Sequence, residues 1–150
     1  MELSEKSEEL TKIRKDSFSK IEQSVVNDLK QLGMPKSQFT IQHENLSDYT
    51  SSGKDAVAYL FSANSDIEPA EISKIASGGE MSRLMLAIKN ILRTSKALPT
   101  VVFDEIDSGV SGEIALRMGA ILREFSKSTQ IINITHLAQI GAKGDANIVV

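Results

Sequence analysis

The chain has 150 residues, of which 41% are hydrophobic and 25% charged, and its formal net charge at pH 7 is −3. This is the composition of a globular protein, and it excludes collagen-like, low-complexity and wholly disordered chains. The absence of cysteine excludes disulfide scaffolds and thiolate metal sites, and no apolar run approaches the roughly 20 residues that span a bilayer. We therefore expect a cytoplasmic protein that binds no membrane. Because its basic residues are interleaved with acids, we do not expect the chain itself to bind DNA.

The first 33 residues carry the pattern of an amphipathic helix. Apolar side chains recur at steps of three, four or seven residues from Leu3 to Leu32, which fits both a coiled-coil helix and a plain surface helix. Gly33 and Pro35 mark its end, because glycine takes the left-handed cap conformation and proline cannot continue a helix. The first third has only Leu3 and Leu10 as strong anchors, so we expect it to fray or to pair with a helix outside this chain.

Two β-prone stretches follow, at residues 38–43 and 56–61. In the second stretch, apolar residues occupy both the odd and the even positions, so other elements could cover both faces of the strand. Residues 45–54 between them are rich in turn formers, which predicts a hairpin with a long loop. A polar connector at 62–73 then leads to the second half of the chain.

From residue 74 onward, helical and strand patterns alternate. A Gly-Gly turn opens a helix whose apolar residues share one side from Met81 to Leu92, and an apolar strand follows at 101–103. A second helix at 113–125 leads to a second apolar strand at 131–134. Apolar strands joined by a helix form a β-α-β unit, so we predict an α/β fold with a parallel sheet. Ligands bind such sheets beyond the carboxyl ends of the strands.

Two acids, Asp104 and Glu105, end the first strand of that unit. One carboxylate in this position can bind the Mg²⁺ of a nucleotide, and a second can orient the attacking water. Acids at strand ends are also common as solvated loop residues. The pair alone therefore leaves both interpretations open.

Two further groups are candidates for phosphate binding. Ser77, Gly78, Gly79 and Glu80 lie at the start of a helix, where unhindered N–H groups and the positive helix end can face a phosphate. The same residues also fit an ordinary serine N-cap. His136 follows the second strand, where a histidine can donate a hydrogen bond to a phosphate, although a lone histidine is more often structural.

A phosphate-binding P-loop is missing from the sequence. That loop requires a glycine, four residues and then Gly-Lys-Ser or Gly-Lys-Thr. Gly53 and Lys54 are followed by Asp55, and Asp48 stands where the first glycine is required. The chain thus has parts of an ATP site without its main phosphate-holding element.

Three motifs in a fixed order carry a resemblance to a known family. They are Ile-Ala-Ser-Gly-Gly-Glu-Met-Ser-Arg at 75–83, Val-Phe-Asp-Glu-Ile-Asp-Ser-Gly-Val-Ser-Gly at 102–112 and Ile-Thr-His-Leu-Ala-Gln-Ile at 134–140. With this order and spacing, the chain resembles the RecN family of bacterial DNA double-strand-break repair ATPases, which are related to the structural-maintenance-of-chromosomes (SMC) proteins. The resemblance runs from about residue 10 to the end of the chain.

The resemblance implies a domain organisation. Residues 34–150 would be the C-terminal lobe of a P-loop NTPase head of the ABC type, and residues 1–33 the end of its coiled coil, entering the head. The lobe that carries the P-loop would lie elsewhere, so the domain would be incomplete. The implied partners are that N-terminal lobe, a second head in a homodimer, and DNA through parts absent from this chain. The family is cytoplasmic and associated with the nucleoid.

The resemblance also implies roles for single residues. Asp104 would act on Mg²⁺ through water, Glu105 would be the general base, and His136 would be the switch residue at the γ-phosphate. The signature motif, which contacts the ATP held by the opposite head, would be Ser77, Gly78, Gly79 and Glu80. The D-loop, which communicates across the dimer, would be Ser108, Gly109, Val110 and Ser111. Ala76 and Ser111 depart from the general ABC pattern, which usually has Leu and Asp at these positions.

On this interpretation, the parent protein hydrolyses ATP with Mg²⁺ and couples hydrolysis to head dimerisation. The chain alone is expected to be inactive, because the β- and γ-phosphates have no cradle. Two alternatives stay open. One is the nucleotide-binding half of another ABC family, which would require an intact P-loop upstream. The other is a non-catalytic dimerisation module, in which the acids and glycines serve only packing.

Overall fold

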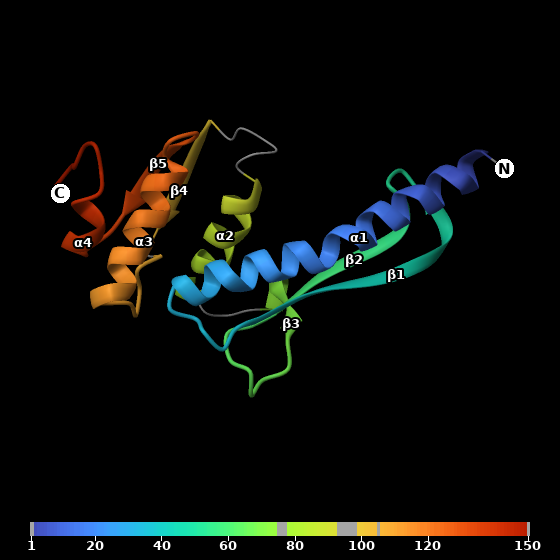
Figure 1. Cartoon of the computed structure of the whole chain (residues 1–150), viewed down its shortest axis with the longest axis horizontal. Coiled ribbons are helices and arrows are strands. Elements are labelled where there is room, and N and C mark those ends of the chain that lie inside the picture. The colour runs from blue at the N-terminus through green and yellow to red at the C-terminus, as the bar shows by residue number, and fades with distance from the viewer. Residues whose placement is uncertain (1, 75–77, 93–98, 105, 150) are drawn as a thin grey trace.

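The computed structural model describes residues 2–74, 78–92, 99–104 and 106–149 (Figure 1). Their order of elements confirms the predicted long helix, hairpin and β-α-β unit, with two short elements, β3 and α4, that were not predicted. In chain order the elements are α1 (Glu2–Gln31), β1 (Gln38–Thr50), β2 (Gly53–Ser62), β3 (Ala70–Glu71), a short 3₁₀ turn (Ile72–Lys74), α2 (Gly78–Leu92), β4 (Thr100–Asp104), α3 (Gly112–Phe125), β5 (Gln130–Ile134) and α4 (Ala138–Gly141).

Helix α1 ends at the predicted glycine cap. Gly33 has a φ of +83°, and the N–H groups of Gly33 and Met34 donate to the carbonyl oxygens of Lys30 and Leu29 at 3.3 and 2.9 Å. This is a Schellman motif. A Cβ atom at Gly33 would lie 2.9 Å from the side chain of Ile114 in α3. Both the backbone conformation and the available space therefore favour glycine.

The hairpin of β1 and β2 is longer than predicted. Its strands are joined by two residues only, 51–52. Pairing is regular as far as Asn45 opposite Asp55, shifts register, and resumes at Thr50 opposite Gly53. The prediction of a long loop at 45–54 was therefore wrong, because most of the turn-forming residues lie within the strands, beside the irregularity in their pairing.

The N-terminal half of α1 lies along this hairpin (Figure 1). The link is Asp55, whose side chain is fully buried. It accepts hydrogen bonds from His43 Nε2 at 2.7 Å, Thr11 Oγ1 at 2.7 Å and Arg14 Nη1 at 2.5 Å. These bonds, that of His43 first, lower the pKa of Asp55 to about 2. The first third of this helix was expected to fray or to pair with a helix outside the chain. It is helical from Glu2 and is anchored near its end by the hairpin through Thr11 and Arg14, so it does not fray. Pairing with a helix outside the chain stays a prediction.

Strands β4 and β5 form the predicted parallel pair. Their register runs from Thr100 opposite Gln130 to Asp104 opposite Ile134, and α3 is the crossover between them. Within the described residues, this sheet consists of these two strands. The separate antiparallel sheet is completed by β3, which pairs with the last residues of β2.

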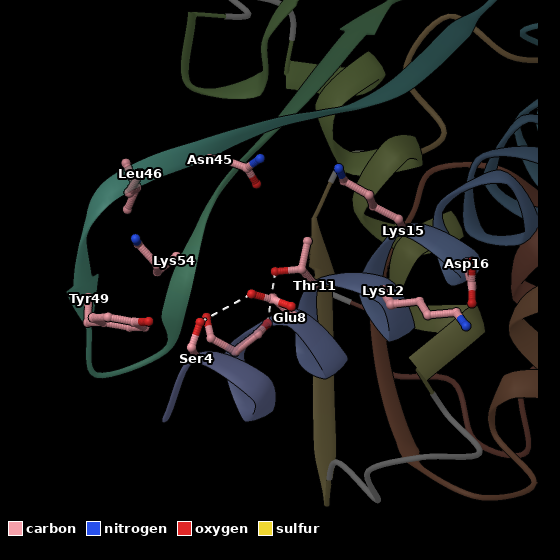
Figure 2. A pocket seen from close by; sticks show the side chains of 11 residues that line it. Ser4, Glu8, Thr11, Lys12, Lys15, Asp16, Asn45, Leu46, Tyr49 and Lys54 are labelled. Carbon is pink, nitrogen blue, oxygen red and sulfur yellow. Dashed lines mark hydrogen bonds between the residues drawn. The ribbon is translucent and has the colours of Figure 1, made fainter. Parts of the chain in front are cut away.

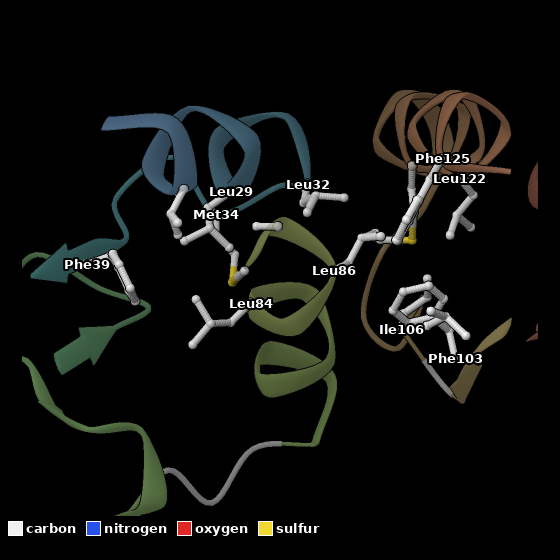
Figure 3. Close-up of a cluster of buried hydrophobic side chains, with 14 of the residues drawn as sticks. Leu29, Leu32, Met34, Phe39, Leu84, Leu86, Phe103, Ile106, Leu122 and Phe125 are labelled. Atoms are coloured by element: carbon white, nitrogen blue, oxygen red, sulfur yellow. The ribbon is translucent and has the colours of Figure 1, made fainter. Parts of the chain in front are cut away.

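One hydrophobic core runs through the molecule, with α2 at its centre (Figures 1 and 3). On one side α2 meets α1 and the hairpin, and on the other it faces the unit of β4, α3 and β5. The predicted apolar side of α2 packs on this core from Met81 to Ile91, whereas Leu92 is 44% exposed. The fully buried large side chains include Val25, Leu29, Leu32, Leu84, Leu86, Ile106, Met118 and Phe125.

Among the described residues, no helix combines the length and the apolar character required to cross a membrane. The 30-residue α1 is long enough to span a bilayer, but its surface is mostly charged and polar.

Candidate functional site

The carboxyl ends of β4 and β5 bring two of the predicted site residues to the same edge of the sheet. Asp104 is the last residue of β4 and pairs with Ile134, the last residue of β5. His136 follows two residues later and is 73% exposed. Asp104 is also exposed. The predicted general base, Glu105, lies outside the described residues.

The predicted D-loop follows β4 and is largely at the surface. Ser108, Gly109 and Ser111 are exposed, and Val110 is half-buried. The N–H of Val110 donates to the carbonyl oxygen of Asp107 at 3.1 Å, which closes a tight turn. Gly109 has a φ of +73°, a backbone conformation that favours glycine.

The predicted signature motif lies at the first turn of α2, next to this loop. Gly78 is exposed, and Gly79 and Glu80 are half-buried, while Ser77 lies outside the described residues. A Cβ atom at Gly79 would lie 3.2 Å from Cβ of Ser108 and 3.4 Å from its carbonyl oxygen. The helix N-terminus and the D-loop therefore meet closely, as the absence of a side chain at Gly79 allows.

Arg83, one turn further along α2, holds the two parts together. Its Nη1 donates to the carbonyl oxygens of Ser108 at 2.7 Å and Ile106 at 3.4 Å. Burial lowers the pKa of its guanidinium group, and the nearby Glu80 opposes that effect. No role was predicted for Arg83, although it stands in the motif at 75–83, because helical periodicity does not distinguish it from a surface residue.

Asp107 joins the loop after β4 to the loop after β5. Its side chain is 1% exposed, and its Oδ2 accepts a hydrogen bond from the hydroxyl of Thr135 and lies 3.5 Å from Nδ1 of His136. The Thr135 hydroxyl in turn accepts from the N–H of Leu137 at 3.1 Å. Asp107 was not among the predicted site residues. The available signal was that a third acid follows Asp104 and Glu105 before the chain turns.

The described residues contain no group of three or more His, Cys, Asp or Glu side chains placed to hold a metal ion. The exposed carboxylate of Asp104 can contribute one oxygen ligand to a hard cation whose other ligands are water or phosphate.

A groove of about 490 Å³ lies elsewhere, between the N-terminal half of α1 and the hairpin (Figure 2). Its described lining comes from α1, β1 and β2 and mixes three lysines with Glu8 and Asp16. The candidate site instead lies at the surface, where a helix N-terminus meets two loops. An exposed site of this kind is suited to contact with the surface of another protein or lobe.

Solved structures with the same architecture are SMC head domains. The Smc head domain with an extended coiled coil from Pyrococcus furiosus, bound to the C-terminal domain of ScpA, matches 83% of this chain and 30% of its own length, with a TM-score of 0.60 and 22% identity. A structure from work on ATP-driven dimerisation and DNA-stimulated activation of SMC ATPases matches 89% of this chain and 78% of its own, with a TM-score of 0.54 and 22% identity. The predicted α/β head fold is confirmed, and it is that of the SMC ATPase heads.

Relatives in sequence narrow this class. DNA repair protein RecN of Rickettsia prowazekii is 44% identical over 128 residues, or 85% of this chain, and that of Haemophilus influenzae is 37% identical over 136 residues, or 90%. RecN of Mycobacterium leprae is 35% identical over 169 aligned residues, covering 99% of this chain. The chain belongs to the RecN family, and it spans 23%, 24% and 29% of the length of these three relatives. No family model matches it.

Proposed function

We propose that this chain is the C-terminal lobe of a RecN-type ATPase head that acts in DNA double-strand-break repair and recombination. The observation that carries the proposal is the gathering of three predicted parts on one exposed surface. Gly79 of the signature motif lies against Ser108 of the D-loop, and Asp104 and His136 lie at neighbouring strand ends. A scaffold held together only by packing does not require these groups at one accessible place.

In the proposed ATPase, each part has a chemical task. The N-terminus of α2 presents backbone N–H groups at Gly78 and Gly79 to the phosphates of an ATP held by a second head. Asp104 would hold Mg²⁺ through water, and His136 would face the γ-phosphate. Glu105 accepts the proton of the attacking water. Mg²⁺, when bound with ATP, neutralises the charge that develops on the phosphates.

The lobe with the P-loop is the proposed partner for the uncovered face of the parallel sheet. Val102, Ile132 and Ile134 share this face and are 59%, 47% and 57% exposed. Parallel sheets are usually covered on both faces, and clustered exposed apolar side chains mark interaction surfaces. The described elements leave this face open, which supports a second lobe from another part of the polypeptide.

The proposed boundary at residue 33 separates the lobe from the end of a coiled coil. Leu3 and Ile13 on α1 are 64% and 60% exposed although they are large and apolar. Their exposure supports packing against a second helix from outside this chain.

Replacing Glu105 with Gln in a RecN-type protein that contains this chain and its P-loop lobe tests the proposal. We expect ATP turnover to fall at least about 100-fold, because the general base is lost, while ATP still binds. ATP-bound dimers should therefore accumulate, which size-exclusion chromatography with light scattering measures. Glu113→Gln is the control, since Glu113 is an exposed acid paired with Arg117 on α3.

Two results would contradict the proposal. Glu105→Gln would leave both turnover and dimerisation unchanged if the acids served only packing. Normal ATPase activity of the 150-residue chain alone would show that its activity does not depend on a separate P-loop lobe.

A further inference from the structure

A buried carboxylate lies directly behind the exposed histidine at the end of β5. The ring of His136 is 73% exposed, but its Nδ1 lies 3.5 Å from Oδ2 of Asp107, whose side chain is 1% exposed. One ring nitrogen therefore faces a protein carboxylate. The second, Nε2, has no hydrogen-bond partner among the described residues.

The same carboxylate also fixes the backbone around the histidine. The Thr135 hydroxyl donates to Asp107 and accepts a hydrogen bond from the N–H of Leu137 at 3.1 Å. Thr135 and Leu137 are the residues on either side of His136. The position of the ring is thus set from both of its chain neighbours through one buried group.

Asp107 has capacity for a further donor. Among the described residues, its Oδ1 is buried and has no hydrogen-bond partner. The ring of His136 lies nearest to the other oxygen, Oδ2, which accepts from Thr135 and has a second lone pair for an Nδ1–H donor. Hydrogen bonds between catalytic groups are often long in the absence of ligand and shorten when the ligand binds.

We propose that Asp107 is a positioning residue for His136. It accepts a hydrogen bond from the Nδ1–H group, which keeps the proton of the neutral ring on Nδ1 and holds Nε2 outward. To donate to a phosphate oxygen through Nε2 as well, the ring has to carry a proton on each of its nitrogens. The phosphate step rests on the proposed function, whereas the state of the ring in the free chain does not.

The state of the ring can be measured in the unmodified 150-residue chain. Long-range ¹H–¹⁵N NMR at a pH where histidine is neutral reports which ring nitrogen carries the proton, and we expect Nδ1. In Asp107→Asn the amide oxygen can still accept from Thr135, but the charge is lost, so we expect the proton to shift towards Nε2. Asp145→Asn is the matched control, since it removes an exposed acid paired with Arg123 and should leave the ring of His136 unchanged.

Turnover by the longer protein gives a second measurement. With its P-loop lobe present, Asp107→Asn should lower kcat roughly 10- to 100-fold, as loss of an orienting partner does, with little change in KM. His136→Gln provides the reference for complete loss of the histidine.

The outcomes separate this inference from the proposed function. A proton on Nε2 in the unmodified chain overturns the positioning role, and that measurement needs no variant to fold. Full turnover by His136→Gln would instead contradict the role of His136 in hydrolysis, while the NMR result would still decide the pairing with Asp107. Equal tautomer populations in the unmodified chain and Asp107→Asn also overturn the inference.

Discussion

Three buried polar side chains join segments that lie far apart in the sequence. Asp55 ties α1 to the hairpin, Arg83 ties α2 to the loop after β4, and Asp107 ties that loop to the loop after β5. Each partnership crosses at least 25 residues of sequence, from Arg14 to Asp55, from Arg83 to Ser108 and from Asp107 to Thr135. Local pattern carries no signal for such contacts. The exposed residues of the candidate site were therefore predicted, whereas Arg83 and Asp107, which join its helix and loops, were not.

The first prediction concerns the acid limb of stability, set by Asp55. Its pKa lies at about 2 in the folded chain against 3.8 for the unperturbed group. The ionised carboxylate therefore stabilises the fold above about pH 4, and this contribution is lost as the pH falls from about 4 to about 2. We expect Asp55→Asn to be less stable than the unmodified chain at pH 5 to 7, about the same near pH 2, and less dependent on pH between these limits.

Urea unfolding followed by circular dichroism across this pH range measures the effect. Asp145→Asn, which removes an exposed partner of Arg123, should follow the unmodified chain. Parallel curves for Asp55→Asn and the unmodified chain would rule out the assigned role of the buried carboxylate.

At the scale of elements, helices and apolar strands followed their sequence patterns, and the hairpin did not. The end of α1 was predictable because Gly33 and Pro35 act locally through their own backbone preferences. The long strands of the hairpin were not predictable, because Asn45, Ser47 and Asp48 are turn formers in isolation but lie within β1. Within the fold, the strands pair with one another and lie beside α1 through Asp55, and this tertiary contact outweighs local preference.

The second prediction concerns the junction of α1 with α3 at Gly33. Gly33→Ala forces a side chain into a left-handed conformation and against Ile114, 2.9 Å away. We expect a loss of about 1–3 kcal/mol in the free energy of unfolding, measured by urea denaturation. Gly78→Ala is the matched control, because a Cβ atom there would meet nothing within 4 Å.

A double variant divides this loss into its two causes. Adding Ile114→Ala to Gly33→Ala should recover the steric part and leave the backbone part. If Gly33→Ala were as stable as Gly78→Ala, the close approach of α1 and α3 at this position would be contradicted.

At the scale of the whole molecule, the order of elements and the SMC-type head fold followed from the sequence, and the relative placement of the two halves did not. Hydrophobic patterns mark which side of α2 is buried, but not that this helix lies between the hairpin and the β4–α3–β5 unit (Figure 3). The candidate site was predicted as separate motifs. Their meeting at Gly79 and Ser108 is a property of the folded chain.

The third prediction concerns the uncovered face of the parallel sheet. We expect Val102→Ser, Ile132→Ser and Ile134→Ser, combined, to change the stability of the chain alone by less than about 1 kcal/mol per site, since these side chains are already about half exposed. Binding of a separately produced P-loop lobe should be reduced at least about tenfold, as measured by calorimetry. Leu116→Ser is the control, since Leu116 is an apolar residue of α3 that is 48% exposed.

The parallel pairing of β4 and β5 also bears on how such a head is assembled. Each of these strands uses one row of its backbone N–H and C=O groups for the other, and among the described residues no third strand takes up the outer rows. Unpaired backbone N–H and C=O groups at the edge of a sheet can pair with a strand of the same chain or of another chain. On the proposed function, the correct strand belongs to a lobe separated from this one by a coiled coil, and contacts between such distant segments form slowly. On the same proposal, pairing of β4 or β5 with a second copy of the chain competes with pairing to that strand.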